Sequence, residues 1–222
     1  MLTEKLTVKT ETVFSDDRRN RYLLRKEWDS KKPRATIIMT NPSSADLMMM
    51  DYTTLYILNN ISMLDFGAVD IVNLSSKVTT KLNVKNHLEP EIEKDNADFI
   101  LKSAERSDAI IIAWGKLGEN NRKVRQAQDN LLSLLAPFRD KLYCISDSED
   151  GEGGFHPLAP QIRFSWILKP FVPPIPLEEP PAKPKRGRPR KSELAPLLVD
   201  DEPVSQSEIP NEEILSDLPE NL

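Results

Sequence analysis

Four short apolar segments alternate with helical segments over the first 170 residues, and this alternation constrains the fold more than any other feature. Each apolar segment lacks strict alternation of polar and apolar residues, which is typical of strands covered on both faces. The strand segments are Ala35–Thr40, Ala68–Leu74, Ala109–Trp114 and Leu142–Ser146, and the helical segments are Tyr52–Leu64, Pro90–Arg106 and Arg122–Leu135. Strands that alternate with helices predict a parallel sheet between helical layers.

The N-terminal part of the chain has the pattern of a β-hairpin. Leu6–Phe14 and Arg21–Trp28 flank the turn-forming cluster Ser15-Asp16-Asp17. We therefore expect a three-layer α/β domain over residues 1–170, with a central, mainly parallel four-stranded sheet preceded by this hairpin. Basic residues outnumber acidic ones between Arg18 and Arg34, which predicts a local basic patch. Its members are Arg18, Arg19, Arg21, Arg25, Lys26, Lys31, Lys32 and Arg34.

Residues 171–222 differ from the rest in composition. They hold most of the prolines and the whole acidic excess behind the formal net charge of −5. Too few large apolar residues remain there to form a core, so we expect a disordered, proline-rich tail. The first 170 residues are electrically neutral, so the total charge says little about what the folded part binds.

Several classes of protein are excluded by composition. No apolar run approaches the roughly 20 residues that span a bilayer, and the N-terminus lacks the apolar core of a signal peptide. Cys144 is the single cysteine, so an intrachain disulfide and a cysteine-based metal cluster are excluded. We expect a cytoplasmic protein without a metal or cofactor and without membrane contact, associated with the nucleoid if its host is a prokaryote or a phage.

Polar residues follow the predicted strands at the edge where parallel sheets bind ligands. Taken singly, each has an ordinary structural explanation as a turn residue, a backbone partner or a solvated side chain. As a set at one edge, they indicate a binding site. The set comprises Asn41, Pro42 and Ser43 after the first strand, Asn73 in the second, Trp114 before Gly115 in the third, and His156 and Leu158 beyond the glycine-rich loop after the fourth.

Two resemblances rest on these residues. From about Phe14 to Ile167 the chain resembles a family of uncharacterised prokaryotic and phage domains. The shared motifs are Asn41-Pro42-Ser43-x-Ala45-Asp46, Val72-Asn73-Leu74, Trp114-Gly115 and His156-Pro157-Leu158. The same order of motifs is distantly similar to the uracil-DNA glycosylase superfamily.

The glycosylase resemblance implies a role for each motif residue. Asn41 would position a water molecule with Pro42 and Ser43 beside the base, and Asn73 would read the extruded base. Trp114 would close the third strand. His156 would donate to the base oxygen, and Leu158 would be a wedge in the minor groove. Met39 replaces the glycine that opens the first motif of the superfamily, which argues against uracil itself as the target.

Breaking an N-glycosidic bond needs a donor near the oxygen on which charge develops, a positioned water and an extruded nucleotide. Asn activates water less well than Asp, so we expect slow chemistry or none. Asp46 and Asp51 are nearby acidic alternatives, with helix capping or structural pairing as an equally good explanation. Tyr52 and Tyr56 are the candidate stacking aromatics.

The tail contains a basic motif that resembles an AT-hook, with the core Arg-Gly-Arg-Pro. A thin core of this kind fits a narrow A/T-rich minor groove, where the negative potential attracts arginine. Its flanking cations would contact phosphates, which makes binding salt-dependent. The alternative is a plain basic linker or a nuclear-localisation-like run. The motif residues are Lys185, Arg186, Gly187, Arg188, Pro189, Arg190 and Lys191, within residues 184–191.

The sequence therefore predicts a DNA-binding protein whose glycosylase-like domain recognises a base and is tethered by the hook to A/T-rich DNA. Two alternatives stay open. One is a non-catalytic DNA-binding protein, such as a regulatory factor between host and phage. The other is an enzyme that acts on a free nucleotide. The acidic end of the tail, from Asp200 onward, is a candidate site for a protein partner.

Overall fold

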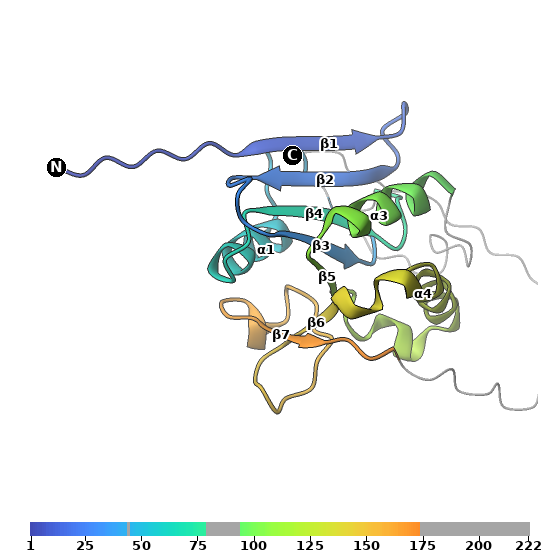
Figure 1. Cartoon of the computed structure of the whole chain (residues 1–222). Helices are drawn as coiled ribbons and strands as arrows, with labels where there is room; N and C mark the ends of the chain where they lie inside the picture. Colours follow the sequence, from blue (N-terminus) through green and yellow to red (C-terminus); the bar gives the residue numbers. More distant parts are fainter. Residues whose placement is uncertain (44, 79–93, 174–222) are drawn as a thin grey trace, which may run out of the picture. The chain divides into compact units, whose positions relative to one another are not determined.

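The computed structural model of the chain describes residues 1–43, 45–78 and 94–173 (Figure 1). Within these residues, seven strands form one sheet in the order β1-β2-β4-β3-β5-β6-β7. The strands are β1 (Lys9–Phe14), β2 (Arg21–Glu27), β3 (Arg34–Met39), β4 (Ala68–Asn73), β5 (Ala109–Ile112), β6 (Leu142–Ser146) and β7 (Ile167–Pro170).

The sheet is mixed, which corrects the prediction of a mainly parallel four-stranded sheet. The four predicted strands, β3 to β6, lie together and pair in parallel. The hairpin extends this group because β2 pairs antiparallel with β4, in a register that places Leu24 opposite Ile71. At the other edge β7 pairs antiparallel with β6. Sequence patterns do not reveal β7, since it has four residues and ends in proline.

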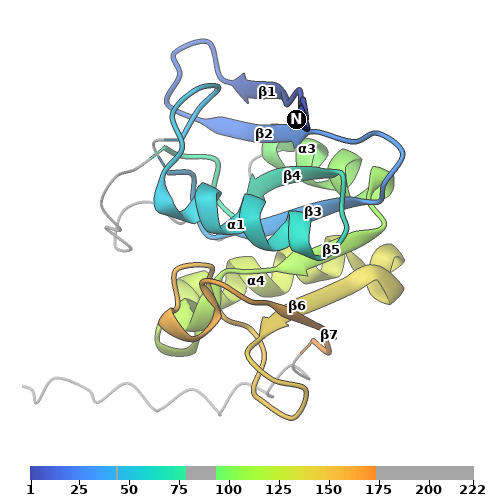
Figure 2. The same ribbon diagram turned by 90° about the vertical axis from the view of Figure 1, so that its left-hand side faces the viewer.

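Helices cover both faces of the sheet (Figure 2). On one face, Ile57 and Ile61 of α1 (Tyr52–Met63) pack with strand residues such as Ile37 and with Trp166. On the other face, α3 (Lys94–Arg106) and α4 (Arg122–Leu134) cover the alternate strand residues. Three short 3₁₀ helices complete the described elements, namely η1 (Gly115–Asn120), η2 (Ala136–Lys141) and η3 (Pro160–Ile162).

The three predicted helical segments agree with α1, α3 and α4, although the predicted start at Pro90 lies outside the described residues. Residues 174–222 also lie outside them, and with them most of the predicted disordered tail and the whole hook at 184–191. Among the described residues, no helix has both the length and the apolar character that crossing a membrane requires.

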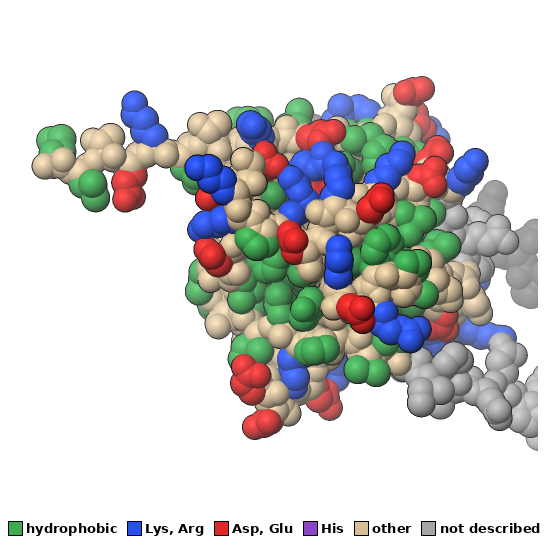
Figure 3. Space-filling view, viewed as in Figure 1, with side chains coloured by type: hydrophobic (Ala, Val, Ile, Leu, Met, Phe, Trp, Pro, Cys, Tyr) green, Lys and Arg blue, Asp and Glu red, His purple; other side chains and the backbone are tan. Residues whose placement is uncertain are grey.

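The predicted basic patch is wrong as a surface feature, because most of its side chains are buried or paired with carboxylates. Asp70 on β4 is fully buried and accepts two hydrogen bonds from Arg25, at 2.8 and 3.0 Å. Arg34 and Arg106 reach the same carboxylate at 3.2 and 3.1 Å. On the face seen in Figure 3, acidic side chains are interspersed among the basic ones over the part where Figure 1 places β1 and β2.

Candidate functional site

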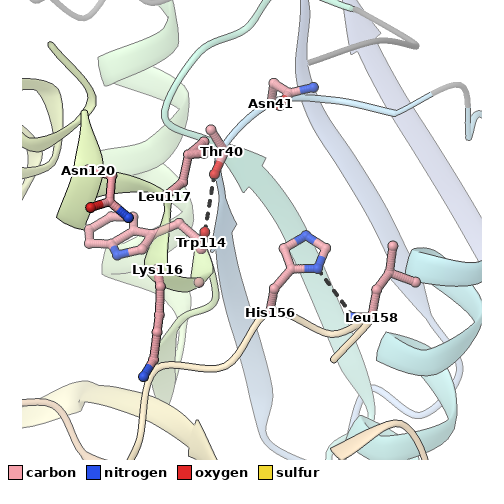
Figure 4. Close-up of a pocket in the computed structure, with 9 residues that line it drawn as sticks. Thr40, Asn41, Trp114, Lys116, Leu117, Asn120, His156 and Leu158 are labelled. Atoms are coloured by element: carbon pink, nitrogen blue, oxygen red, sulfur yellow. Dashed lines mark hydrogen bonds between the residues drawn. The ribbon is translucent and has the colours of Figure 1, made fainter. Parts of the chain in front are cut away.

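A cavity of about 530 Å³ lies at the carboxyl ends of β3 and β5, where the rule for α/β sheets predicts a ligand. Figure 4 shows Trp114, Leu117 and Asn120 on one side and His156 and Leu158 on the other, with Asn41 at the end of β3. The lining residues are Thr40, Asn41, Trp114, Gly115, Lys116, Leu117, Asn120, His156 and Leu158. Four predicted site residues, Asn41, Trp114, His156 and Leu158, therefore line one cavity.

The Trp114-Gly115 turn holds the histidine loop in place. Gly115 has a φ of 67°, and a β-carbon added there would lie 3.1 Å from the Cβ of His156. The turn thus needs glycine both for its left-handed backbone and for the close approach of the loop. Thr40 Oγ1 donates to the carbonyl oxygen of Trp114 at 3.4 Å, which joins the end of β3 to this turn.

His156 presents a neutral imidazole. The backbone N–H of Leu158 donates to Nδ1 at 3.2 Å, so in the neutral ring the proton is on Nε2. Burial lowers the pKa of His156 from its ordinary 6.5, while the carboxylate of Asp51 acts in the opposite direction. In Figure 4 the second ring nitrogen points toward the end of β3, where Asn41 lies. The arrangement provides a neutral N–H donor inside the cavity at pH 7.

The Asn41-Pro42-Ser43 segment divides between the cavity and the loop behind it. Asn41 is half-buried, and its Nδ2 donates to the carbonyl oxygen of Pro42 at 3.3 Å. Pro42 is buried, and Ser43 Oγ accepts from the backbone N–H of Ala45 at 3.4 Å. Pro42 and Ser43 are not lining residues of the cavity. Pro42 and Ser43 instead form the turn that follows Asn41 and holds it at the cavity.

A buried arginine, Arg21, donates hydrogen bonds to the backbone of this turn. The pairing of β1 with β2 shifts register at Tyr22, so that Tyr22 and Leu23 both face α3 while Arg21 faces the other way. Arg21 is 1% exposed, and its Nη1 donates to the carbonyl oxygens of Ser43 and Ala45. Burial lowers the pKa of Arg21 to about 10, an effect that nearby carboxylates oppose.

Asn73 does not reach the open cavity, although it lies beside it. It pairs in register with Met39, one strand away from the segment that bears Asn41. Its side chain is fully buried, and neither Nδ2 nor Oδ1 has a hydrogen-bond partner among the described residues. By strand alternation it shares the α1 face with Val69 and Ile71. An unpaired buried amide is costly and is often explained by function.

The two acidic alternatives are both engaged with backbone N–H groups. Asp51 is the N-cap of α1, where its Oδ1 accepts from the N–H of Thr54 at 2.8 Å. Asp46 accepts from the N–H groups of Met48 and Met49, both at 2.9 Å, and these bonds lower its pKa. Asp51 still matters for the site, because its charge acts on both Arg21 and His156.

Several residues that line the cavity were not predicted from the sequence. Thr40, Lys116, Leu117 and Asn120 line the cavity. A signal for the last three does exist, since Lys116 and Leu117 directly follow the Trp-Gly strand end and Asn120 lies shortly after it. The role of Arg21 depends on a register shift that has no sequence signature. In the described part of the chain, no group of three or more His, Cys, Asp or Glu residues is placed to hold a metal ion.

Comparison with protein families gives a match over more than half of the chain. The model of a family described as "Protein of unknown function (DUF1643)" matches residues 21–158, which include Arg21, Asn41, Asn73, Trp114 and His156. Searches of curated proteins and of solved structures found no match.

Proposed function

The chain belongs to the DUF1643 family, and for this member we propose a DNA-binding protein whose carboxyl-edge cavity recognises, and slowly excises, an extruded base. The observation that carries the proposal is the convergence of Asn41, His156, Trp114 and Leu158 on one cavity of about 530 Å³. The volume lies in the usual range for small-molecule sites, which is about 300–1,000 Å³. The four residues come from three separate loops, as the distant resemblance to glycosylases implies.

The chemistry would be hydrolysis of an N-glycosidic bond. One water molecule adds its oxygen to the sugar carbon, the bond to the base breaks, and the base leaves with a proton. His156 would donate from Nε2 to the base oxygen on which negative charge develops, and a neutral donor does this without being titrated. Asn41 would hold the water, and its weak activating power makes the proposed reaction slow.

Asn73 would read the base edge. Its amide offers both a donor and an acceptor, and neither is engaged within the described residues. Since Asn73 is fully buried and lies one strand away from the cavity wall, a local rearrangement would have to open a path before a base could reach it. The binding of a base would then pair an amide that is unpaired in the free protein, which favours the bound state.

The hook-like motif of the tail would tether this domain to A/T-rich DNA. Arg186 and Arg188 would lie along the minor groove, which raises the local concentration of the domain on DNA. The proposal places the protein in the cytoplasm, on the nucleoid of a prokaryotic or phage-infected cell. The acidic end of the tail remains a candidate for a protein partner.

The test is a search for released bases. The full chain is incubated with single-stranded and duplex oligonucleotides that each contain one deaminated or otherwise modified base, and free bases are measured by mass spectrometry. Release from at least one substrate is expected. His156→Gln should slow release about 100-fold, as expected for the loss of a transition-state donor. Asn41→Asp should speed release, because a carboxylate activates water better than an amide.

Two further results would redirect the proposal. If substrates bind at the cavity but no variant releases a base, the protein recognises a base without excising it. The weak activation of water by an amide such as Asn41 is consistent with that result. The other result is that no modified base binds at the cavity and none is released, although the chain binds duplex DNA and loses this binding with Arg186→Ala and Arg188→Ala. In that case the hook is the sole DNA-binding element, and the base-binding cavity is refuted.

A further inference from the structure

Three aromatic side chains gather on the surface of the α1 side, and we call them the aromatic platform (Tyr52, Tyr56 and Phe164). Tyr52 is 73% exposed and Phe164 is 74% exposed. The rings of Tyr52 and Tyr56 stack with centroids 6.4 Å apart and planes at 25°. Phe164 meets Tyr56 edge to face at 5.8 Å. Aromatic surface that stays in water in this way commonly marks an interaction site.

The platform is continuous with the rim of the cavity through Arg163. The guanidinium of Arg163 lies 6.0 Å from the ring centroid of Tyr56. Its Nε donates at 3.1 Å to the carbonyl oxygen of Leu158, which lines the cavity. Asn60 fixes this arrangement, since its Nδ2 donates to the carbonyl oxygens of Tyr56 and Arg163 at 2.8 and 2.9 Å. The segment that bears Arg163 and Phe164 is therefore fastened to α1, next to the cavity residue Leu158.

A second link runs through the start of α1. Tyr52 directly follows Asp51, whose carboxylate acts on His156 in the cavity. The start of the platform is thus near enough to the histidine loop for the charge of Asp51 to act on His156. A ligand with one unit in the cavity and further units outside would lay those units on the aromatic rings.

We propose that the aromatic platform binds unpaired nucleobases next to the one in the cavity, so that the preferred ligand is a single-stranded or locally opened nucleic acid. This inference rests on the proposed function, because a base in the cavity has further nucleotides as its covalent neighbours. Base–aromatic stacking tolerates any sequence, and Arg163 adds a cation that stacks on rings and attracts phosphates. A protein partner or a second copy of the chain are the competing occupants.

The platform is tested by binding of the full chain to a labelled oligothymidylate of about 12 nucleotides. The background carries Arg186→Ala and Arg188→Ala, so that the tail motif contributes little. Phe164→Ala and Tyr52→Ala should each weaken binding by about tenfold, while Phe164→Tyr keeps the stack and should bind normally. Leu134→Ala is the matched control, since Leu134 is also exposed (40%) but belongs to α4 on the opposite face.

An abasic strand of the same length separates stacking from attraction to phosphates. It should bind at least about tenfold more weakly than the oligothymidylate, because it has no bases to stack. Equal binding of the two strands would overturn the proposal, and so would unchanged binding by Phe164→Ala. If Phe164→Ala instead abolishes self-association in sedimentation experiments and leaves binding intact, the occupant is a second copy and the proposal fails.

Failure of this inference can be told from failure of the proposed function. The platform assay needs no target base and no base release. Loss of oligothymidylate binding in Phe164→Ala together with absence of any base release would keep the platform and refute the glycosylase-like chemistry. Base release that proceeds equally well in Phe164→Ala and in the unchanged chain, at limiting substrate, would refute the platform alone.

Discussion

Two buried polar side chains lie three residues apart on β4, and they differ in their hydrogen-bond partners. The carboxylate of Asp70 is surrounded by Arg25, Arg34 and Arg106 at 2.8–3.2 Å. The amide of Asn73 is equally buried, yet it has no partner among the described residues. A buried charge must be paired to be tolerated within the fold, and Asp70 is. An unpaired buried amide is costly in the free protein, but it can still form hydrogen bonds with a ligand. The comparison separates a polar group that stabilises the fold from one that we assign to a ligand.

Asp70→Asn gives the largest expected effect. It removes the charge around which three arginines are arranged, and breaking such a buried network costs about 3–5 kcal/mol of the free energy of unfolding. Urea unfolding followed by circular dichroism measures it. A loss below about 1 kcal/mol would place Asp70 among ordinary surface ion pairs and remove one side of the comparison.

Asn73→Leu is expected to have the opposite sign. Leucine has a similar size, and it removes two buried polar atoms that lack partners, so the free energy of unfolding should rise by about 1 kcal/mol or more. The same variant should lose base release and base binding. A destabilisation as large as that of Asp70→Asn would show that the amide of Asn73 is engaged in the free protein, which contradicts the comparison.

Gly115→Ala tests how the cavity is held together. Alanine at a φ of 67° is strained, and its β-carbon would press on the Cβ of His156 at 3.1 Å. We expect a loss of stability of about 1–2 kcal/mol, with displacement of the histidine loop visible as a changed NMR signal of His156. Gly154→Ala is a useful control, because Gly154 also has a positive φ but has open space around it. A normal His156 signal in Gly115→Ala would refute the packing argument.

The smallest expected effect is a dependence of stability on pH. Burial lowers the folded-state pKa of His156 below its ordinary 6.5. Below that value the unfolded chain binds the proton more readily, so stability falls as the pH drops from 6.5 through the folded pKa. His156→Gln should lose this component and show a shallower decline between about pH 7 and pH 5. Parallel profiles of the two proteins would contradict a buried, neutral histidine.

The sequence was sufficient to predict the parallel strands and a shared edge for Asn41, Trp114, His156 and Leu158, which line one cavity. Asn73 was expected in the same set, but it does not line that cavity. The four lining residues could be predicted because they follow or flank apolar strands, whose carboxyl ends must lie at one edge. Three features could not be predicted. The register shift at Tyr22, which turns Arg21 toward the Ser43 turn, has no local signature. The burial of Asn73 away from the cavity has no local signature, and the pairing of the basic residues with Asp70 joins residues 36 to 45 positions apart.

The side-chain amide of Asn73 can show whether the carboxyl edge of the sheet binds a base, as we propose. Its NMR signals can be followed in an isotope-labelled full chain while oligonucleotides with single modified bases are added. At least one of them is expected to shift the signals of the Asn73 amide and the His156 ring together, while the Arg25 signals beside Asp70 stay unchanged. If every oligonucleotide leaves Asn73 and His156 unaffected, while the tail still binds duplex DNA, base binding at this edge is contradicted.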